Sequence, residues 1–389
     1  IKDYVSRMTE SVAGMKALLL DKETTAIVSM VYSRTKVLEK EVFLFQRLDA
    51  ERRGEMMHLK AVVFLRPTRE NITTLVKELQ EPKFGEYHLF FSNILSNDFV
   101  RMLAQADKFE LVKQLQEFYA DYYAMSSFCW SLSLPTNSPI NMQDSERIRD
   151  GLLAMLLALK KKPAIRYQKS SRDAERIAAL LSQHMDQHLD VFDFHLSRAP
   201  DTPPLLLILD RFDDPVTPLL NQWTYQSMVH ELLGIRNNVV ELPADPTSAG
   251  GGAQKKPTET QQLVFSAEAD EFYRDNLYTD YGQIHDRLVH ALEAFKKAGG
   301  AGGAEASFQS IADMQRFVER FPELARQKEA VARHVHVLHA LARRVEKEGI
   351  MEASELEQQL ACVQDYKTAQ RLVTSMVSGS VPPAAASDA

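Results

Sequence analysis

The chain has 389 residues, enough for two or three domains at about 100–200 residues each. Its 45% hydrophobic and 25% charged residues are ordinary for a globular protein. A net charge of −7 favours neither nucleic-acid binding nor attachment to an anionic membrane surface, and two cysteines, Cys129 and Cys362, are too few for a disulfide framework. No apolar run approaches the roughly 18–20 residues that cross a bilayer, so we expect contact with membranes only through other proteins.

The first 130 residues alternate between buried strands and helices. Clear apolar strands are expected at 16–20, 59–65 and 87–91, and helices at 1–13, 71–79 and 98–106. This alternation predicts a parallel sheet with helices on both faces, in a first α/β domain over residues 1–130.

Residues 131–243 are expected to form a second α/β domain. A linker around 134–139 is followed by helices at 145–160 and 174–188 and then by the apolar run Leu205–Leu209. Five consecutive apolar residues are typical of a strand that is buried on both faces.

Residues 244–389 change character and are predicted to be mainly helical. Residues 245–256 have the composition of a flexible linker, residues 298–304 read AGGAGGA, and Pro322 interrupts a helical pattern. Beyond it, apolar residues recur at spacings of four and three, which predicts a heptad seam in a helical hairpin: Val331, Val335, Leu338, Ala342 and Val345. The last twelve residues, rich in Pro and Ala, are expected to have no regular structure.

No cofactor or metal site is predicted. AGGAGGA follows a helix and lacks the spacing of a phosphate-binding loop. His334, His336 and His339 lie two and three residues apart with no HExxH motif or cysteine partner, so a packed or solvated role is favoured. Asp210 and Asp213 follow a strand and could form an acid/base pair, although an ion pair with Arg211 that locks the turn is the preferred interpretation.

The most specific pattern follows that strand. It reads ILDR-x-x-D-x-x-x-P-L-x-x-x-x-T-Y-Q-x-M, then continues through Leu232, Leu233, Ile235 and Asn238. This pattern resembles the SM (Sec/Munc-like) family of SNARE-binding proteins, as do residues 15–40 and 266–276. Within the family, the resemblance is to the branch that serves endosomal and trans-Golgi traffic and vacuolar protein sorting.

The resemblance implies a fold and several sites. The fold is an arch of two α/β domains and a mainly helical third domain, and the second domain is completed by a later segment that this sequence lacks. A pocket on the first domain would bind the N-terminal peptide of a syntaxin, at Val100, Leu103, Ala104, Leu115 and Phe118. Asp210, Arg211, Asp213 and Trp223 would have structural roles at the junction of the second and third domains.

The implied function is to bind an endosomal or trans-Golgi syntaxin and to template SNARE assembly. Phe321 and Pro322 would mark a helical tip that binds a vesicle SNARE. The protein would be a monomer and not an enzyme, cytoplasmic, and attached to Golgi or endosome membranes through SNAREs. The alternative is an α/β enzyme or nucleotide-binding protein that uses Asp210 and Asp213, which a thermal-shift screen with nucleotides and Mg²⁺ would reveal. A structural tether that binds no isolated syntaxin is a third possibility.

Overall fold

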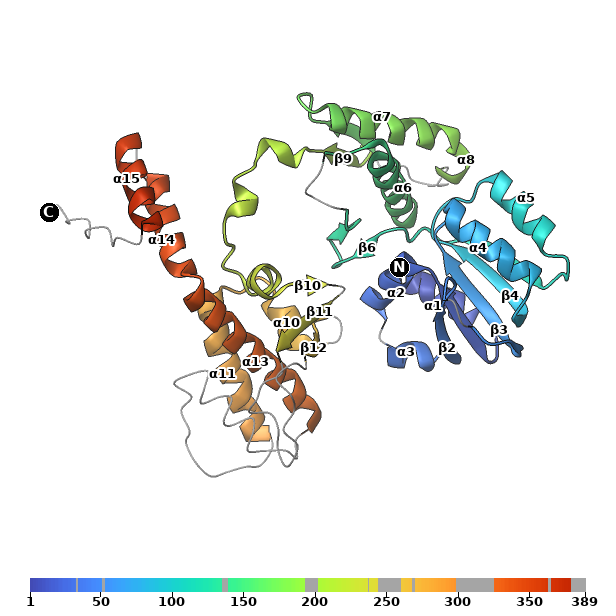
Figure 1. Cartoon of the computed structure of the whole chain (residues 1–389), viewed down its shortest axis with the longest axis horizontal. Helices are drawn as coiled ribbons and strands as arrows, with labels where there is room; N and C mark the ends of the chain where they lie inside the picture. Colours follow the sequence, from blue (N-terminus) through green and yellow to red (C-terminus); the bar gives the residue numbers. More distant parts are fainter. Residues whose placement is uncertain are drawn as a thin grey trace. The chain divides into compact units, whose positions relative to one another are not determined.

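The computed structural model describes ten stretches of the chain: residues 1–32, 34–50, 53–134, 139–192, 202–236, 238–243, 260–267, 270–298, 325–362 and 365–378. The chain divides into two compact units, Ile1–Asp213 and Asp214–Ala389. Each unit has its own hydrophobic core residues, and the chain can be followed through both in Figure 1.

The first unit is built on a five-stranded parallel sheet with the strand order β2-β1-β3-β4-β5. This order is that of a doubly wound α/β fold, in which the chain starts in the middle and winds outward in both directions. The sheet confirms the three expected strands and has an edge strand on each side. The strands are β1 (Lys16–Leu20), β2 (Val42–Arg47), β3 (Met56–Leu65), β4 (Phe84–Phe91) and β5 (Val112–Glu117).

Helices cover both faces of this sheet because successive side chains of its central strands point in turn into two different cores. Leu19 and Val63 pack into one core with α4 and α5, whereas Leu18 and Phe64 pack into the other with α1 and α2. Figure 1 shows the two helix pairs on opposite sides of the strands. The helices are α1 (Lys2–Glu10), α2 (Lys22–Val31), α4 (Arg69–Gln80) and α5 (Asn97–Ala106), with the short α3 (Arg34–Leu38) beside β2.

Three of these helices begin at polar residues at or just beyond the carboxyl end of a strand. Asp21, Thr68 and Ser96 each cap a helix by accepting a hydrogen bond from a backbone N–H of its first turn. Capping of this kind satisfies donors that the helix itself cannot use. The caps bring the N-termini of α2, α4 and α5 to one edge of the sheet.

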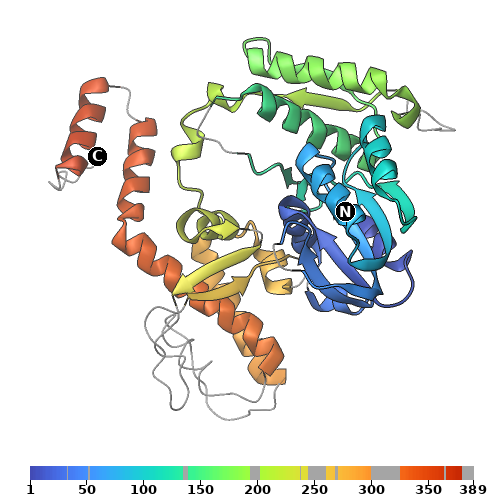
Figure 2. The ribbon, with the colours of Figure 1, turned by 45° about the vertical axis from the view of Figure 1, so that its right-hand side comes forward.

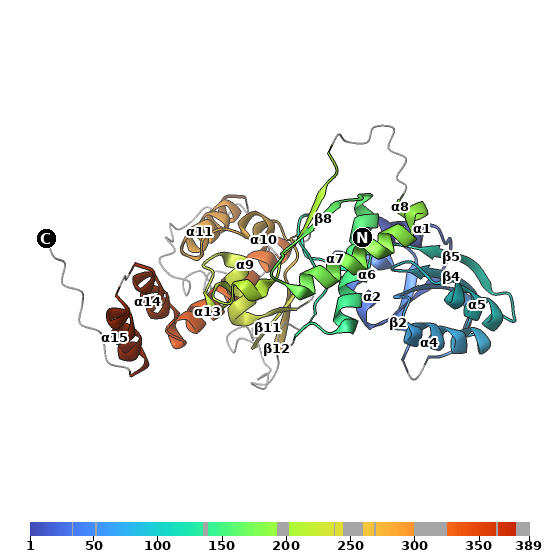
Figure 3. The ribbon, with the colours of Figure 1, turned by 90° about the horizontal axis from the view of Figure 1, so that it is seen from above.

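The rest of the first unit packs around a third core. Its helices α6 and α7 lie against each other (Figure 3), and its two longer strands form a small parallel sheet. The elements are β6 (Tyr123–Ala124), β7 (Trp130–Ser131), α6 (Met142–Leu159), β8 (Ala164–Tyr167), α7 (Arg172–Gln187), α8 (Leu189–Phe192), β9 (Leu205–Ile208) and the 3-10 turn η1 (Arg211–Asp213).

The expectation that the run Leu205–Leu209 is buried on both faces is wrong. Leu205, Leu207 and Leu209 are exposed, and only Leu206 and Ile208 pack against the core of α6 and α7. The reason is that β9 pairs only with β8 among the described residues, and the described helices cover one face of this pair.

The second unit combines a small antiparallel sheet with helices. In Figure 2 its yellow strands lie against the orange helices. Its elements are η2 (Thr217–Leu219), α9 (Tyr225–Met228), the π-helical turn η3 (Val229–Leu233), β10 (Ile235–Arg236), β11 (Val239–Pro243), β12 (Thr260–Val264), α10 (Glu271–Asn276), α11 (Tyr281–Ala298), α13 (Ala325–Lys347), α14 (Ile350–Cys362) and α15 (Tyr366–Val377).

Residues before position 243 belong to the same core as the helices that follow. Tyr225 and Val240 are buried together with Tyr273, Leu288 and Leu338. The expected boundary between residues 243 and 244 therefore does not coincide with a boundary between compact units, which falls after Asp213. The boundary at 130/131 stays a prediction.

The heptad seam is confirmed for Val335, Leu338 and Val345, which are buried, whereas Leu341 is buried more deeply than Ala342. The AGGAGGA segment from residue 299 onward, Pro322, the linker at 245–256 and the tail beyond residue 378 lie outside the described residues. None of the described helices is long and apolar enough to cross a membrane.

The central sheet sets the stability of the first unit. Phe64→Ala should lower the free energy of unfolding by about 3–5 kcal/mol, because it removes a buried ring and leaves a cavity. Met57→Ala, on the exposed end of the same strand, is the matched control and should change it by no more than about 0.5 kcal/mol. Urea denaturation of both variants measures the difference, and equal losses would contradict it.

Candidate functional site

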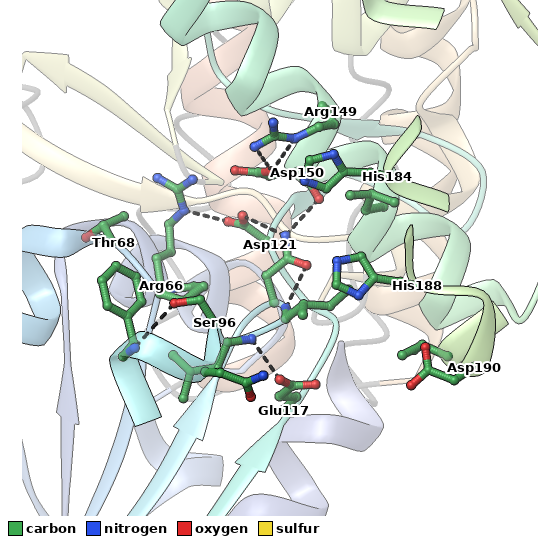
Figure 4. Close-up of a pocket in the computed structure, with 18 residues that line it drawn as sticks. Arg66, Thr68, Ser96, Glu117, Asp121, Arg149, Asp150, His184, His188 and Asp190 are labelled. Atoms are coloured by element: carbon green, nitrogen blue, oxygen red, sulfur yellow. Dashed lines mark hydrogen bonds and ion pairs between the residues drawn. The ribbon is translucent and has the colours of Figure 1, made fainter. Parts of the chain in front are cut away.

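A cavity of about 550 Å³ lies at the carboxyl edge of the five-stranded sheet (Figure 4). It is bounded by the segments that follow β3, β4 and β5 and by α6 and α7. Ligands of open α/β sheets bind at this edge, which makes the cavity the first candidate site. Its polar lining residues are Arg66, Thr68, Asn93, Ser96, Asn97, Glu117, Asp121, Arg149, Asp150, His184, His188 and Asp190.

A buried carboxylate lies at the centre of the charged groups in this cavity. Asp121 is 1% exposed and forms ion pairs with Arg66 Nε at 2.7 Å and Arg147 Nη1 at 3.2 Å. Burial raises the pKa of Asp121 to about 6, although both arginines act in the opposite direction. The carboxylate thus ties β3 to α6, and Arg66 reaches on to Glu23 of α2.

Other charged groups of the cavity are also bound by the protein. Arg149 pairs with Asp150 at 2.7 Å, and Glu117 accepts a hydrogen bond from the Leu95 amide at 2.7 Å. His184 lies beside the Arg149–Asp150 pair in Figure 4, and burial lowers its pKa, so that the ring is neutral at pH 7. These contacts are typical of a polar joint between packed layers.

The crevice between β1 and β3, where the strand order reverses, is filled by the chain itself. Asp21 accepts hydrogen bonds from the amides of Thr24 and Arg66 and from Asn71 Nδ2, each at 2.7 Å. In nucleotide-binding relatives of this topology the ligand sits at this crevice. Sequence reasoning did not single out Asp21, although an aspartate directly after a buried strand was the available signal.

No metal site is present in the part of the chain that the structure describes, because no three His, Cys, Asp or Glu side chains gather suitably. His334, which the sequence assigned to a packed or solvated role, is fully buried.

The predicted peptide pocket is only partly at the surface. Val100 and Leu115 are each 37% exposed, and Ala104 is exposed as well. Leu103 is 3% exposed and packs beneath α5 in the core on that face of the sheet. Leu103 is therefore a core residue, and its assignment to the pocket is corrected.

Phe118 is also corrected to the core. It is 8% exposed, and its ring stacks between Tyr4 and Phe90, with centroids 5.1 Å from each. These contacts lie on the face of the sheet opposite to Leu103. The expected helical spacing of the predicted pocket residues does not hold beyond Ala106, because residues 112–117 form the strand β5, in which successive side chains point to opposite faces of the sheet. Met102 and Phe109 are exposed nearby and were missed.

Asp210 and Asp213 lock the turn after β9. Asp210 accepts hydrogen bonds from Ser171 Oγ at 2.5 Å and from the Phe212 amide at 2.9 Å, and the first of these lowers the pKa of Asp210. Asp213 accepts a hydrogen bond from Gln168. The structure thus gives both carboxylates hydrogen-bond donors at the start of α7 and just after β8.

Trp223 joins three helical segments of the second unit. Its Nε1 donates to Ser354 Oγ of α14 at 3.0 Å, its ring lies beside that of Tyr281, and its carbonyl accepts from the Tyr281 amide. It is partly buried and packs against the core. This geometry is that of an anchor. Phe321 and Pro322 lie outside the described residues.

Comparison with known proteins gives a consistent result. Residues 16–386 match the model of the Sec1 family. The chain is 44% identical over 381 residues to vacuolar protein sorting-associated protein 45 of Rattus norvegicus, which covers 97% of this chain and 65% of the relative. It is 45% identical over 373 residues to the Homo sapiens protein of the same name, which covers 95% of this chain and 63% of the relative. The chain thus spans slightly less than two thirds of the length of these relatives.

Solved structures agree. The SM protein Vps45 in complex with the Qa SNARE Tlg2 superposes with a TM-score of 0.84 at 39% identity, covering 98% of this chain and 67% of that chain. The Unc18–syntaxin 1 complex from Monosiga brevicollis gives a TM-score of 0.78 at 20% identity, covering 98% of this chain and 69% of that one, which shows a shared fold.

The buried carboxylate predicts a pH dependence. Because the folded pKa of Asp121 is about 6 and an unfolded Asp titrates near 3.9, the folded state holds this proton more tightly. Its contribution to stability should fall as the pH rises from about 4 to about 6 and stay constant above that. The difference in unfolding free energy between the protein and Asp121→Asn, measured by denaturation from pH 4 to 7, isolates this term. A difference that grows with pH would show that the arginines lower the pKa instead.

Proposed function

This chain belongs to the Sec1 family, and we propose that it binds a syntaxin and regulates vesicle docking and fusion in endosomal and trans-Golgi traffic. The observation that carries the proposal is the likeness, over 98% of the chain, to a relative solved in complex with a Qa SNARE. The names of the similar sequences, which refer to vacuolar protein sorting, support the same branch of membrane traffic.

The physical task in this proposal is assembly without covalent chemistry. A protein that holds partner helices in register lowers the entropic cost of nucleating a helical bundle. The polar cavity at the sheet edge fits this view, because its described charged groups bind one another and join helices to the sheet. The chain would act as a monomer in the cytoplasm and reach Golgi and endosome membranes through its SNARE partners.

The enzyme alternative has little support. Asp210 and Asp213 accept hydrogen bonds from Ser171 and Gln168, and Asp21 fills the crevice where a nucleotide would bind. A pull-down of the chain with a panel of syntaxin cytoplasmic domains tests the proposal directly. If the chain retains none of these syntaxin domains, the third possibility, a structural tether that binds no isolated syntaxin, is favoured.

The syntaxin N-terminal peptide is proposed to dock on the outer surface of α5 and β5, at the exposed residues Val100, Ala104 and Leu115. An apolar peptide side chain would cover the two larger residues and remove them from water. Leu103 and Phe118 would support this surface from beneath, in the two cores of the sheet.

Leu115→Arg should therefore weaken the binding of a syntaxin N-terminal peptide by on the order of 1–3 kcal/mol, because it replaces an apolar contact by a charge. Phe43→Arg is the control, since Phe43 is an exposed residue on the opposite edge strand of the same sheet. Titration calorimetry with the peptide measures both. If the two folded variants bind the peptide with equal affinity, the peptide does not dock on this surface.

A vesicle SNARE is proposed to bind the helical tip near Phe321 and Pro322. A proline within a helix removes a hydrogen bond and costs about 3 kcal/mol or more, so the sequence favours a bend at the tip in the absence of a partner. Pro322→Ala should favour an extended helix and strengthen vesicle-SNARE binding, by at most a few kcal/mol. Hydrogen exchange over residues 305–330 and a binding assay measure the two effects. If neither changes, Pro322 only forms a turn.

A further inference from the structure

A buried polar network crosses the core of the second unit at His334 of α13. The ring is 0% exposed. Its Nδ1 lies 2.8 Å from the Tyr225 hydroxyl of α9, and its Nε2 lies 3.1 Å from both carboxylate oxygens of Asp270. Asp270 caps α10 by accepting from the Tyr273 amide, and Arg333 Nη2 lies 3.2 Å from the same carboxylate. Three separate segments thus meet at one imidazole.

The chemistry of these groups permits one arrangement of protons around a neutral ring. An ionised carboxylate only accepts hydrogen bonds, so Nε2 carries the proton and Nδ1 accepts from the Tyr225 hydroxyl. Burial raises the pKa of Asp270, but His334, the Tyr273 amide and Arg333 together lower it further, and the pKa lies below the usual value. The carboxylate is therefore ionised at neutral pH, and His334 is the donor that contacts both of its oxygens.

Everything else that α13 buries is apolar among its described residues: Val335, Val337, Leu338, Leu341 and Val345. Apolar contacts are not directional, and a heptad-spaced seam keeps them after a shift along the helix axis. A shift by one turn is about 5.4 Å and by one heptad about 10.5 Å. A shift toward the start of α13 would place Leu338 or Leu341 opposite Asp270, and neither has a side-chain donor; a shift of one turn the other way would place Ala330 there, which has none either.

The geometry points to His334 as the residue that sets the axial register of α13 against α9 and α10, in the core that α11 shares. A buried polar group that is satisfied in one register and unsatisfied in the others selects that register, as polar residues at core positions do in coiled coils. The rings of Phe265, Phe272 and Tyr273 surround the imidazole and hold its orientation. Resting on the proposed function, His334 would thereby position the end of α13 that leads toward the vesicle-SNARE tip.

Pulsed electron-electron double resonance tests the register without any SNARE. With Cys129 and Cys362 replaced by Ser, spin labels at the exposed positions Gln283 of α11 and Arg343 of α13 report the distance between these helices. His334→Gln keeps an N–H donor for Asp270, whereas His334→Met has a similar length and none. We expect one narrow distance distribution for the parent and for His334→Gln, and a shifted or broadened one, by on the order of 5 Å, for His334→Met.

His339→Met is the matched control, since it makes the same substitution at a partly exposed position of α13 and should leave the distribution narrow. A narrow, unshifted distribution for His334→Met would overturn the inference, because the apolar seam alone would then set the register. If that variant does not fold, Asp270→Ser is added, which removes the carboxylate that has lost its His334 donor and keeps a capping residue for α10. An unshifted or unfolded double variant would equally overturn it.

Vesicle-SNARE binding by the same variants separates this inference from the proposed function. A shifted register with weaker vesicle-SNARE binding and unchanged syntaxin-peptide affinity supports both. A shifted register with unchanged SNARE binding supports the role of His334 in the fold and contradicts the proposal that a vesicle SNARE binds near Phe321 and Pro322.

Discussion

The first unit depends on the burial of its central strands on both faces. Leu18 and Leu19 are adjacent, fully buried and packed into opposite cores, so the sheet requires a helical layer on each side. Polar groups are then excluded from both faces and gather at the carboxyl edge, where the helices begin. The caps, the ion pairs and the cavity all follow from that single constraint.

At this edge the protein satisfies its own polar groups. Asp21 fills the point where the strand order reverses, and Asp121 joins the sheet to α6 through two arginines. A buried carboxylate is bound by side chains of the chain itself in the second unit as well, where Asp270 contacts His334 and Arg333. Buried carboxylates in this chain hold layers and helices in fixed relation.

Several parts of the candidate sites followed from the pattern of residues. The three central strands and the helices α1, α4 and α5 were predictable, because continuous apolar runs and helical spacing leave a clear record in sequence. The peptide surface was predictable only as a region. Leu103 and Leu115 are both leucines at apolar positions, yet one lies in the core and the other at an edge that no further strand covers in the described residues.

The sequence by itself therefore determined the parallel sheet and the family, since these depend on local periodicity and a long motif. Only the tertiary structure decided which apolar residues remain exposed, as at Leu205 and Leu207 of β9, because exposure depends on whether another element covers a face. It also decided the partners of His334. Tyr225 and Asp270 lie 109 and 64 residues away along the chain, and contacts at that separation leave no periodic signal in a single sequence.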